Sequence, residues 1–187
     1  MTEALLGAMP SGGWTVDDLD QMPVSNIRYE LTDGAMTVSP SPSNLHQRLS
    51  AALTIRLAAE VPPELDVAQA VEIRFARQLT RIPDVMLVRS DDPGRHWFAP
   101  AEVVVAIEIE SPGNHIEDRT TKPVLYARYG IPHYWRIELL PLQVTTYQLR
   151  EGDTYHKVSR GDRIKIDEPL ALDIPLVELL PRWARRG

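Results

Sequence analysis

Two acidic residues, Asp84 and Glu108, fall where predicted strands meet loops. Asp84 follows Pro83 at the start of an apolar stretch, and Glu108 directly follows Val103–Ile107, a run that is apolar on both faces. Such a run is typical of a central strand that is covered on both sides, so we expect the carboxylate at its end to be partly buried. If the two strands are neighbours, Asp84 and Glu108 face one cleft. Their oxygens suit a hard divalent cation, Mg²⁺ or Mn²⁺.

A divalent cation between two carboxylates is the arrangement that phosphodiester hydrolysis needs. The ion orients the scissile phosphate, lowers the pKa of the attacking water and stabilises the charge that develops in the transition state. A lysine close by adds a fixed positive charge or orients that water. The pair Asp84 and Glu108 therefore predicts a metal site with hydrolytic chemistry.

The elements that must position these residues follow from hydrophobic periodicity and turn signals. Asp33-Gly34 predicts a hairpin turn between two short strands, and leucines at every fourth position from Leu45 to Leu57 predict a helix that covers a sheet. The spacing of Thr15 and Asp18 predicts a capping box that opens a short helix. Thr120 or Thr121 to Tyr129 predicts a helix closed by Gly130, with Lys122 in its first turn. The predicted strands are Ile27–Leu31, Ala35–Val38, Leu65–Ala68, Val71–Phe75, Asp84–Val88, Val103–Ile107, Tyr134–Leu139, Val144–Leu149 and Tyr155–Val158. The fold class is therefore α/β, with a mixed central β-sheet, flanking helices and an N-terminal β-hairpin.

Composition limits what the chain can be. Its 187 residues, 43% of them hydrophobic, suit one domain over 1–187, with residues 1–13 as a loose N-terminal arm. No apolar run has the roughly 20 residues of a membrane helix, so we expect no membrane association and a cytoplasmic location. The chain has no cysteine, which excludes disulfides and thiolate ligands. The net charge of -6 argues against a protein that coats nucleic acid through its overall charge, but it does not exclude a nuclease.

Several segments, taken in order, resemble a known family. Tyr29–Gly34, Ser39-Pro40 and His46 are similar to the opening of the Uma-two family, endonucleases of the PD-(D/E)XK superfamily. Pro83-Asp84 resembles the family's PD motif, and 108–112 resembles its Glu-x-x-Ser-Pro segment. Asp118, Lys122, Tyr126, Gly130-Ile131 and Tyr134-Trp135 resemble the run that follows. The resemblance covers about residues 16–138. It implies a restriction-endonuclease-like core, a divalent metal held by Asp84 and Glu108, and a supporting acid at Glu30.

The lysine departs from the superfamily pattern, in which it stands two residues after the second acid. This chain has Glu110 there. Lys122 matches a lysine displaced onto the next helix, so we predict that Glu30, Asp84, Glu108 and Lys122 are the catalytic residues. Glu110 is a secondary candidate that either adds a metal ligand or faces solvent.

The candidates also have purely structural interpretations. Asp84 after Pro83 can cap a turn, and Glu108 can be a strand-end acid that faces water. Glu30 can pair with Arg28 or Arg74, and His46, a second secondary candidate, is more often a hydrogen-bonding histidine than a ligand. Asp118 suits a cap for the helix that carries Lys122.

Three function classes remain open on the sequence. The first is a metal-dependent endonuclease whose substrate is DNA, and the presence of both acids and a lysine favours it. The second is a catalytically inactive nuclease-fold module that binds nucleic acid or regulates, and the third is a small-molecule hydrolase. A homodimer is expected if both strands of a duplex are cut, because two sites related by a two-fold axis do this most simply.

Overall fold

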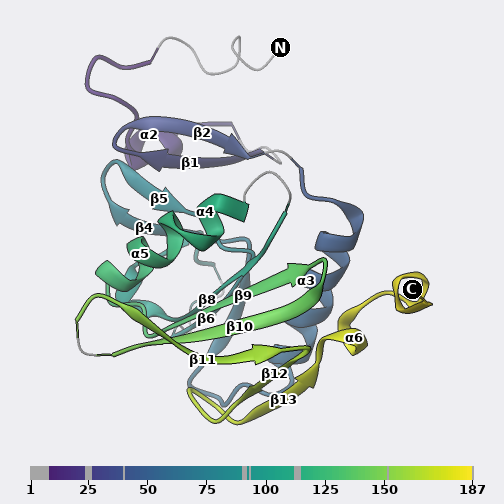
Figure 1. The fold of residues 1–187 in the computed structure, drawn as a ribbon. Helices are drawn as coiled ribbons and strands as arrows, with labels where there is room; N and C mark the ends of the chain where they lie inside the picture. The colour runs from purple at the N-terminus through teal and green to yellow at the C-terminus, as the bar shows by residue number, and fades with distance from the viewer. Residues whose placement is uncertain are drawn as a thin grey trace.

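A six-stranded mixed sheet forms the centre of this computed structural model (Figure 1). The structure describes residues 9–23, 27–39, 41–89, 92, 94–111, 115–150 and 152–186. The strand order is β11-β10-β9-β8-β6-β3, in which β8 and β9 are parallel and all other neighbours are antiparallel. The bounds are β3 Asp66–Gln69, β6 Val85–Val88, β8 Val103–Ile109, β9 His133–Leu139, β10 Leu142–Leu149 and β11 Tyr155–Gly161. The predicted α/β class with a mixed sheet is confirmed.

Helix α3 (Asn44–Ala58) packs on one face of this sheet through its leucine stripe. Leu49, Leu53 and Leu57 are fully buried against strand residues such as Leu87 and Ile107. The Ser43 hydroxyl accepts a hydrogen bond from the amide of His46 and caps the helix. The same core includes residues from β12 (Arg163–Ile166), β13 (Leu172–Pro175) and α6 (Leu176–Leu179), which close this side of the molecule.

The opposite face of the sheet is covered by α5 (Thr121–Arg128) and a smaller three-stranded sheet. That sheet has the order β5-β4-β7, with β5 Leu79–Arg81, β4 Glu72–Ala76 and β7 Trp97–Phe98, and the 3-10 helix η1 (Pro100–Glu102) leads into β8. Tyr126 of α5 packs edge-to-face on Tyr134 of β9, with ring centroids 5.8 Å apart. Helix α5 is preceded by the short helix α4 (His115–Arg119), and Gly130 follows it with a φ of +76°, which glycine adopts without strain.

The N-terminal part lies at one end of the molecule, against β4, β5 and the turn between them (Figure 1). Strands β1 (Arg28–Thr32) and β2 (Ala35–Ser39) make the predicted hairpin, and Thr15 and Asp18 form the predicted capping box of α2 (Val16–Leu19). Within the predicted arm, 1–8 lie outside the described residues. The Gln78 side chain donates a hydrogen bond to the Gly12 carbonyl, so the described end of the arm is attached to the β4–β5 turn.

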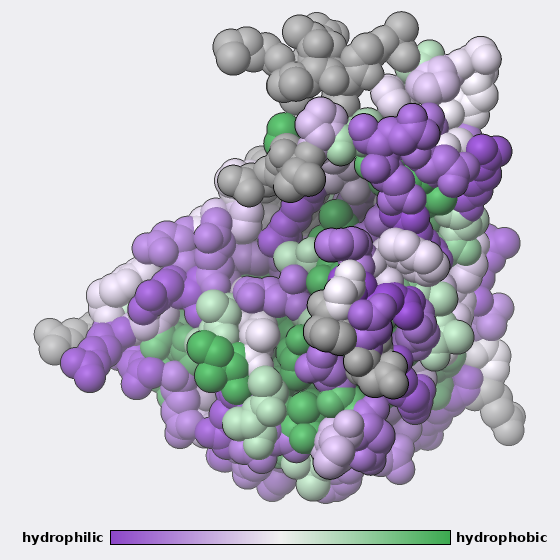
Figure 2. All heavy atoms as spheres, turned by 180° about the vertical axis from the view of Figure 1, so that it is seen from behind, coloured by the Kyte–Doolittle hydropathy of each residue, from purple (hydrophilic) through white to green (hydrophobic). Residues whose placement is uncertain are grey.

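Short elements account for most of the differences from the predicted series. Strands β5, β7, β12 and β13, together with α4, α6 and the 3-10 helix η2 (Arg182–Arg186), have no predicted counterpart. Each has two to five residues, too few for a hydrophobic period to stand out in the sequence. Seen from behind, the surface is mainly hydrophilic, with hydrophobic residues in separate patches near its middle (Figure 2). None of the helices in the described part of the chain has the length and apolar character needed to span a bilayer.

Candidate functional site

Asp84 and Glu108 lie at the same end of two neighbouring strands, Asp84 just before β6 and Glu108 next to the last residue of β8. Strands β6 and β8 are antiparallel, and their register pairs Val85 with Ile107. Asp84 precedes Val85 and Glu108 follows Ile107, so in this antiparallel pair both acids lie at the same end. Both are buried, with exposed fractions of 7% and 2%. The condition that the sequence left open, that the two strands be neighbours, is therefore met.

The ammonium group of Lys122 lies between two carboxylates. Its Nζ is 2.8 Å from Glu108 Oε2 and 2.8 Å from Asp118 Oδ1, and the side chain is almost entirely buried. The hydroxyl of Tyr126, one turn further along α5, donates a 2.7 Å hydrogen bond to Glu108 Oε1. The first turn of α5 thus directs Lys122 back over the end of β8, as predicted, and Pro123 is accommodated there.

Asp84 is held by groups from three other elements. Its Oδ2 accepts hydrogen bonds from the Ile109 amide at 2.8 Å and contacts His46 Nε2 at 3.1 Å, while Arg28 Nη1 lies 3.4 Å from Oδ1. Burial by itself raises the pKa of Asp84, but the His46 and Ile109 contacts and the nearby Lys122 outweigh it and hold that pKa below its ordinary value. Asp84 is therefore ionised at neutral pH.

The negative charges of Glu108 and Glu30 are less well compensated by nearby positive charge and hydrogen bonds than that of Asp84. Burial raises the pKa of Glu108 well above its ordinary value, and the negative charges of Asp118 and Asp84 add to this while Lys122 opposes it. Burial also raises the pKa of Glu30, against the positive charge of Lys122 and a 2.7 Å hydrogen bond from the Ile82 amide to Oε1. Several buried carboxylates thus share one ammonium group, and another positive charge placed among them would stabilise their ionised forms.

The donor set fits a hard divalent cation. Asp84 and Glu108 supply buried carboxylate oxygens, the ligands that Mg²⁺ and Mn²⁺ prefer. Burial first, and the nearby Asp118 and Asp84 carboxylates second, raise the pKa of Glu108, and a cation would favour its ionised form. Within the described residues, no group of three or more histidines, aspartates or glutamates is gathered as a metal site. Mg²⁺ is commonly bound through one or two carboxylates, with waters and substrate phosphate completing its shell. Two protein ligands are therefore sufficient.

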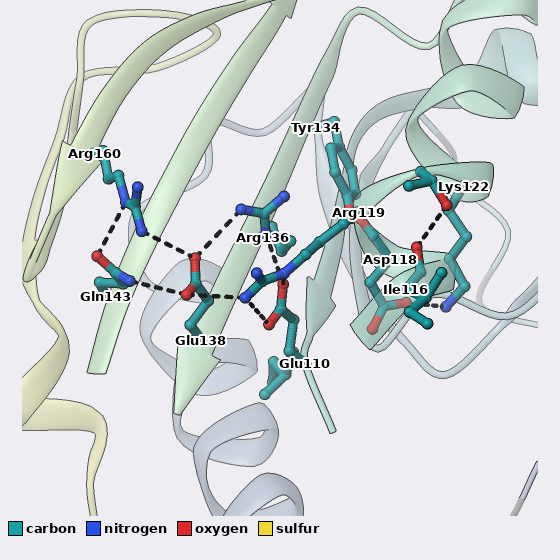
Figure 3. Close-up of polar contacts among 12 residues, drawn as sticks. Glu110, Ile116, Asp118, Arg119, Lys122, Tyr134, Arg136, Glu138, Gln143 and Arg160 are labelled. Carbon is teal, nitrogen blue, oxygen red and sulfur yellow. Dashed lines mark hydrogen bonds and ion pairs between the residues drawn. The ribbon is translucent and has the colours of Figure 1, made fainter. Parts of the chain in front are cut away.

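Glu110 has different partners. Its carboxylate is paired with Arg119 at 2.7 Å and with Arg136 at 2.8 Å, and the same two arginines contact Glu138. This network lies to one side of the Lys122–Asp118 pair (Figure 3). Glu110 is 8% exposed, so it does not face solvent, and its salt bridges are made with Arg119 and Arg136.

Comparison with known proteins places the chain in a family. A sequence profile described as "Putative restriction endonuclease", that of the Uma-two (Uma2) family, matches residues 16–176. The chain belongs to the Uma-two family. A search of curated proteins finds no match. The segments that carried the resemblance fall inside the matched range, although Pro40 and Pro112 lie outside the described residues.

The fold of this Uma-two protein is also found in a solved structure. The crystal structure of "a putative nuclease belonging to DUF820" from Anabaena variabilis superposes with a TM-score of 0.70 at 18% identity. The match covers 89% of this chain and 99% of the other. At this identity the similarity establishes a shared fold and leaves the chemistry to the side chains described above.

Two of the structural interpretations considered for this Uma-two chain are wrong. Asp118 does not cap α5, whose N-cap is Thr120; it pairs with Lys122. Its i,i+4 spacing from Lys122 was a readable signal for that pair. Glu30 pairs with neither arginine considered for it: Arg28 contacts Asp84, and Arg74 contacts Asp20 and Glu72.

Two further contacts could not be predicted from residues close together in the sequence. Arg28 and Asp84 are 56 residues apart in the chain, and Tyr126 and Glu108 are 18 apart. Only the packing of β1 and α5 around the ends of β6 and β8 brings them together.

Proposed function

We propose that this Uma-two protein is a metal-dependent endonuclease that hydrolyses phosphodiester bonds in DNA with Mg²⁺ or Mn²⁺. The observation that carries the proposal is the convergence of Asp84, Glu108 and Lys122 at one end of neighbouring strands. Two buried carboxylates beside a buried ammonium group require long-range packing to assemble and cost stability to bury. Such a cluster is typical of a catalytic site.

Asp84 and Glu108 would hold the cation. When bound, it supplies a Lewis acid that orients the phosphate and lowers the pKa of the attacking water. Asp84 is suited to this because it is ionised, and the Ile109 amide and His46 fix its orientation. His46 therefore acts as a positioning residue for Asp84 in this proposal.

Lys122 would supply a fixed positive charge near the reacting phosphate. The carboxylates of Glu108, Asp118 and Glu30 raise its pKa despite burial, so the group stays protonated. A protonated ammonium donates hydrogen bonds and cannot take a proton from water, so its role is to orient the water or to stabilise negative charge in the transition state. Glu30 adds negative charge beside Lys122 and helps to keep it protonated.

Contacts with DNA phosphates are expected to be few. Arg74 and Arg77, which flank the segment leading to Asp84, are paired with aspartates of the N-terminal region, and Arg81 is buried with its guanidinium on backbone carbonyls. Arg28 is about one-third exposed and lies at the edge of the site, where it can contact a phosphate. Because both strands of a duplex are cut most simply by two symmetric sites, we also propose a homodimer.

The test is incubation with plasmid DNA, single-stranded DNA and RNA in Mg²⁺, in Mn²⁺ and in EDTA. Cleavage by the wild type in metal but not in EDTA, and its loss in Asp84→Ala, is the expected result. Asp173→Ala is a matched control, because Asp173 is an exposed aspartate paired with Arg163 on β12, far along the chain from the site. Metal-dependent binding without cleavage would favour the inactive module, and cleavage of none of these nucleic acids would refute the proposal.

A further inference from the structure

A pocket of about 210 Å³ lies between α5 and the hairpin formed by β10 and β11. One wall consists of Pro123, Val124 and Ala127, which belong to the same helix as Lys122. The opposite side consists of Tyr147 and Tyr155 from the hairpin, whose ring centroids are 6.5 Å apart. The pocket is thus apolar on one side and aromatic on the other, which suits a flat ring.

The two ends of the pocket carry opposite charges. Arg119 and Arg136 lie at one end, and Asp153 and Thr154 lie in the β10–β11 turn at the other. The Arg136 guanidinium carbon is 5.9 Å from the centre of the Tyr147 ring. A ligand that fits has an aromatic body, an anionic group at the arginine end and hydrogen-bond donors at the Asp153 end.

The arginines keep donors for such a ligand although they are paired with Glu110 and Glu138. Each uses its Nε and Nη2 atoms in these pairs (Figure 3). Within the described part of the chain, neither Nη1 has a hydrogen-bond partner. Arg119 is also nearly half exposed. With Arg160, which contacts Glu138, the network holds three arginines against two glutamates and is net positive.

We propose that this pocket binds one unpaired nucleobase of the substrate strand, with a neighbouring phosphate at Arg119. This identification of the ligand rests on the proposed function, because the base belongs to the strand that the enzyme cleaves. Base stacking on aromatic side chains combined with arginine contacts to the backbone is how single strands are bound without base pairing. The pocket shares α5 with the catalytic lysine, so a strand seated in it is held beside the site.

The experiment compares two short single-stranded oligonucleotides of equal length, one with bases and one entirely abasic, by fluorescence anisotropy in EDTA at low salt. Both carry the same phosphate charge, so their difference in affinity reports the bases. We expect the oligonucleotide with bases to bind at least about fivefold more tightly. Val124→Asp, which puts a carboxylate at the rim of the pocket, should abolish this difference.

Ile116→Asp is the matched control, because Ile116 lies on α4, is outside the pocket and is 66% exposed, against 67% for Val124. It should keep the base preference, and circular dichroism should show that both variants fold. Three results would refute binding of a base in this pocket: equal affinity of the wild type for the two oligonucleotides, binding of neither, or equal loss of the base preference in both variants. Absence of metal-dependent cleavage with the base preference intact would refute the proposed function and leave the pocket standing.

Discussion

Replacing Lys122 with methionine removes an ammonium group that lies 2.8 Å from both Glu108 and Asp118. Methionine has a similar length and suits a buried position, so the substitution removes the charge and keeps most of the packing. If Lys122 acts mainly in the transition state, kcat should fall about 100- to 1,000-fold, while substrate binding and the thermal shift induced by Mn²⁺ remain.

The same substitution should also reduce stability. Removing one partner of a buried ion pair costs about 3–5 kcal/mol, because the remaining carboxylates are left without compensation. In a domain of this size each kcal/mol shifts the melting temperature by about 2–4 °C, so Lys122→Met should melt roughly 6–20 °C below the wild type at neutral pH. Cleavage must therefore be compared at a temperature where circular dichroism shows both proteins folded.

The loss of stability in Lys122→Met should depend on pH in a definite direction. The pKa of Glu108 is above its ordinary value in the folded protein, and loss of Lys122 raises it further. A carboxyl group with a raised folded pKa contributes stability that is present below its ordinary pKa and is lost as the pH rises through the folded pKa. The pKa of Asp118 is raised too. The difference in stability between the wild type and Lys122→Met should thus shrink as the pH falls from neutral towards the ordinary pKa of Glu108.

The assays are plasmid nicking in Mn²⁺ for turnover and thermal melts at several pH values for stability. Glu110→Gln is the control, because Glu110 is as buried as the site residues but pairs with Arg119 and Arg136. It should retain measurable cleavage. Wild-type turnover in Lys122→Met together with an inactive Glu110→Gln would show that the positive charge of Lys122 is not used. A stability difference that grows as the pH falls would show that uncompensated carboxylate charge is not its cause.

Four further predictions follow from the same site. Saturating Mn²⁺ should stabilise the wild type, by about 2.7 kcal/mol at 100 times the dissociation constant, and should leave Asp84→Asn unchanged in thermal melts. His46→Ala should weaken Mn²⁺ binding about 10- to 100-fold in calorimetry, because Asp84 loses a partner that orients it. Affinity for DNA should fall steeply between about 50 and 200 mM salt in anisotropy titrations, and tight salt-resistant binding would contradict the proposed phosphate contacts. Light scattering should give the mass of a homodimer, and a monomer at all concentrations would refute that proposal.

Long elements with a clear period could be predicted from the sequence, and short ones could not. The leucine stripe of α3, the apolar run of β8 and the Asp33-Gly34 turn each carry a local signal that tertiary packing preserved. Strand β7 has two residues and pairs with β4, about 25 residues earlier in the chain. Its conformation depends on that partner and has no counterpart in the local pattern.

The sequence by itself determined the family, the order of the main elements, and the presence of Asp84, Glu108 and Lys122 at strand and helix ends. These depend on residue types at short spacing, where periodicity and turn chemistry act. Only the tertiary structure decided what each side chain contacts. It paired Lys122 with Asp118 as well as Glu108, placed His46 on Asp84, and joined Glu110 to Arg119 and Arg136. Most of these contacts join residues far apart in sequence, and burial decides among them because a buried charge must find an opposite charge or a hydrogen bond within reach.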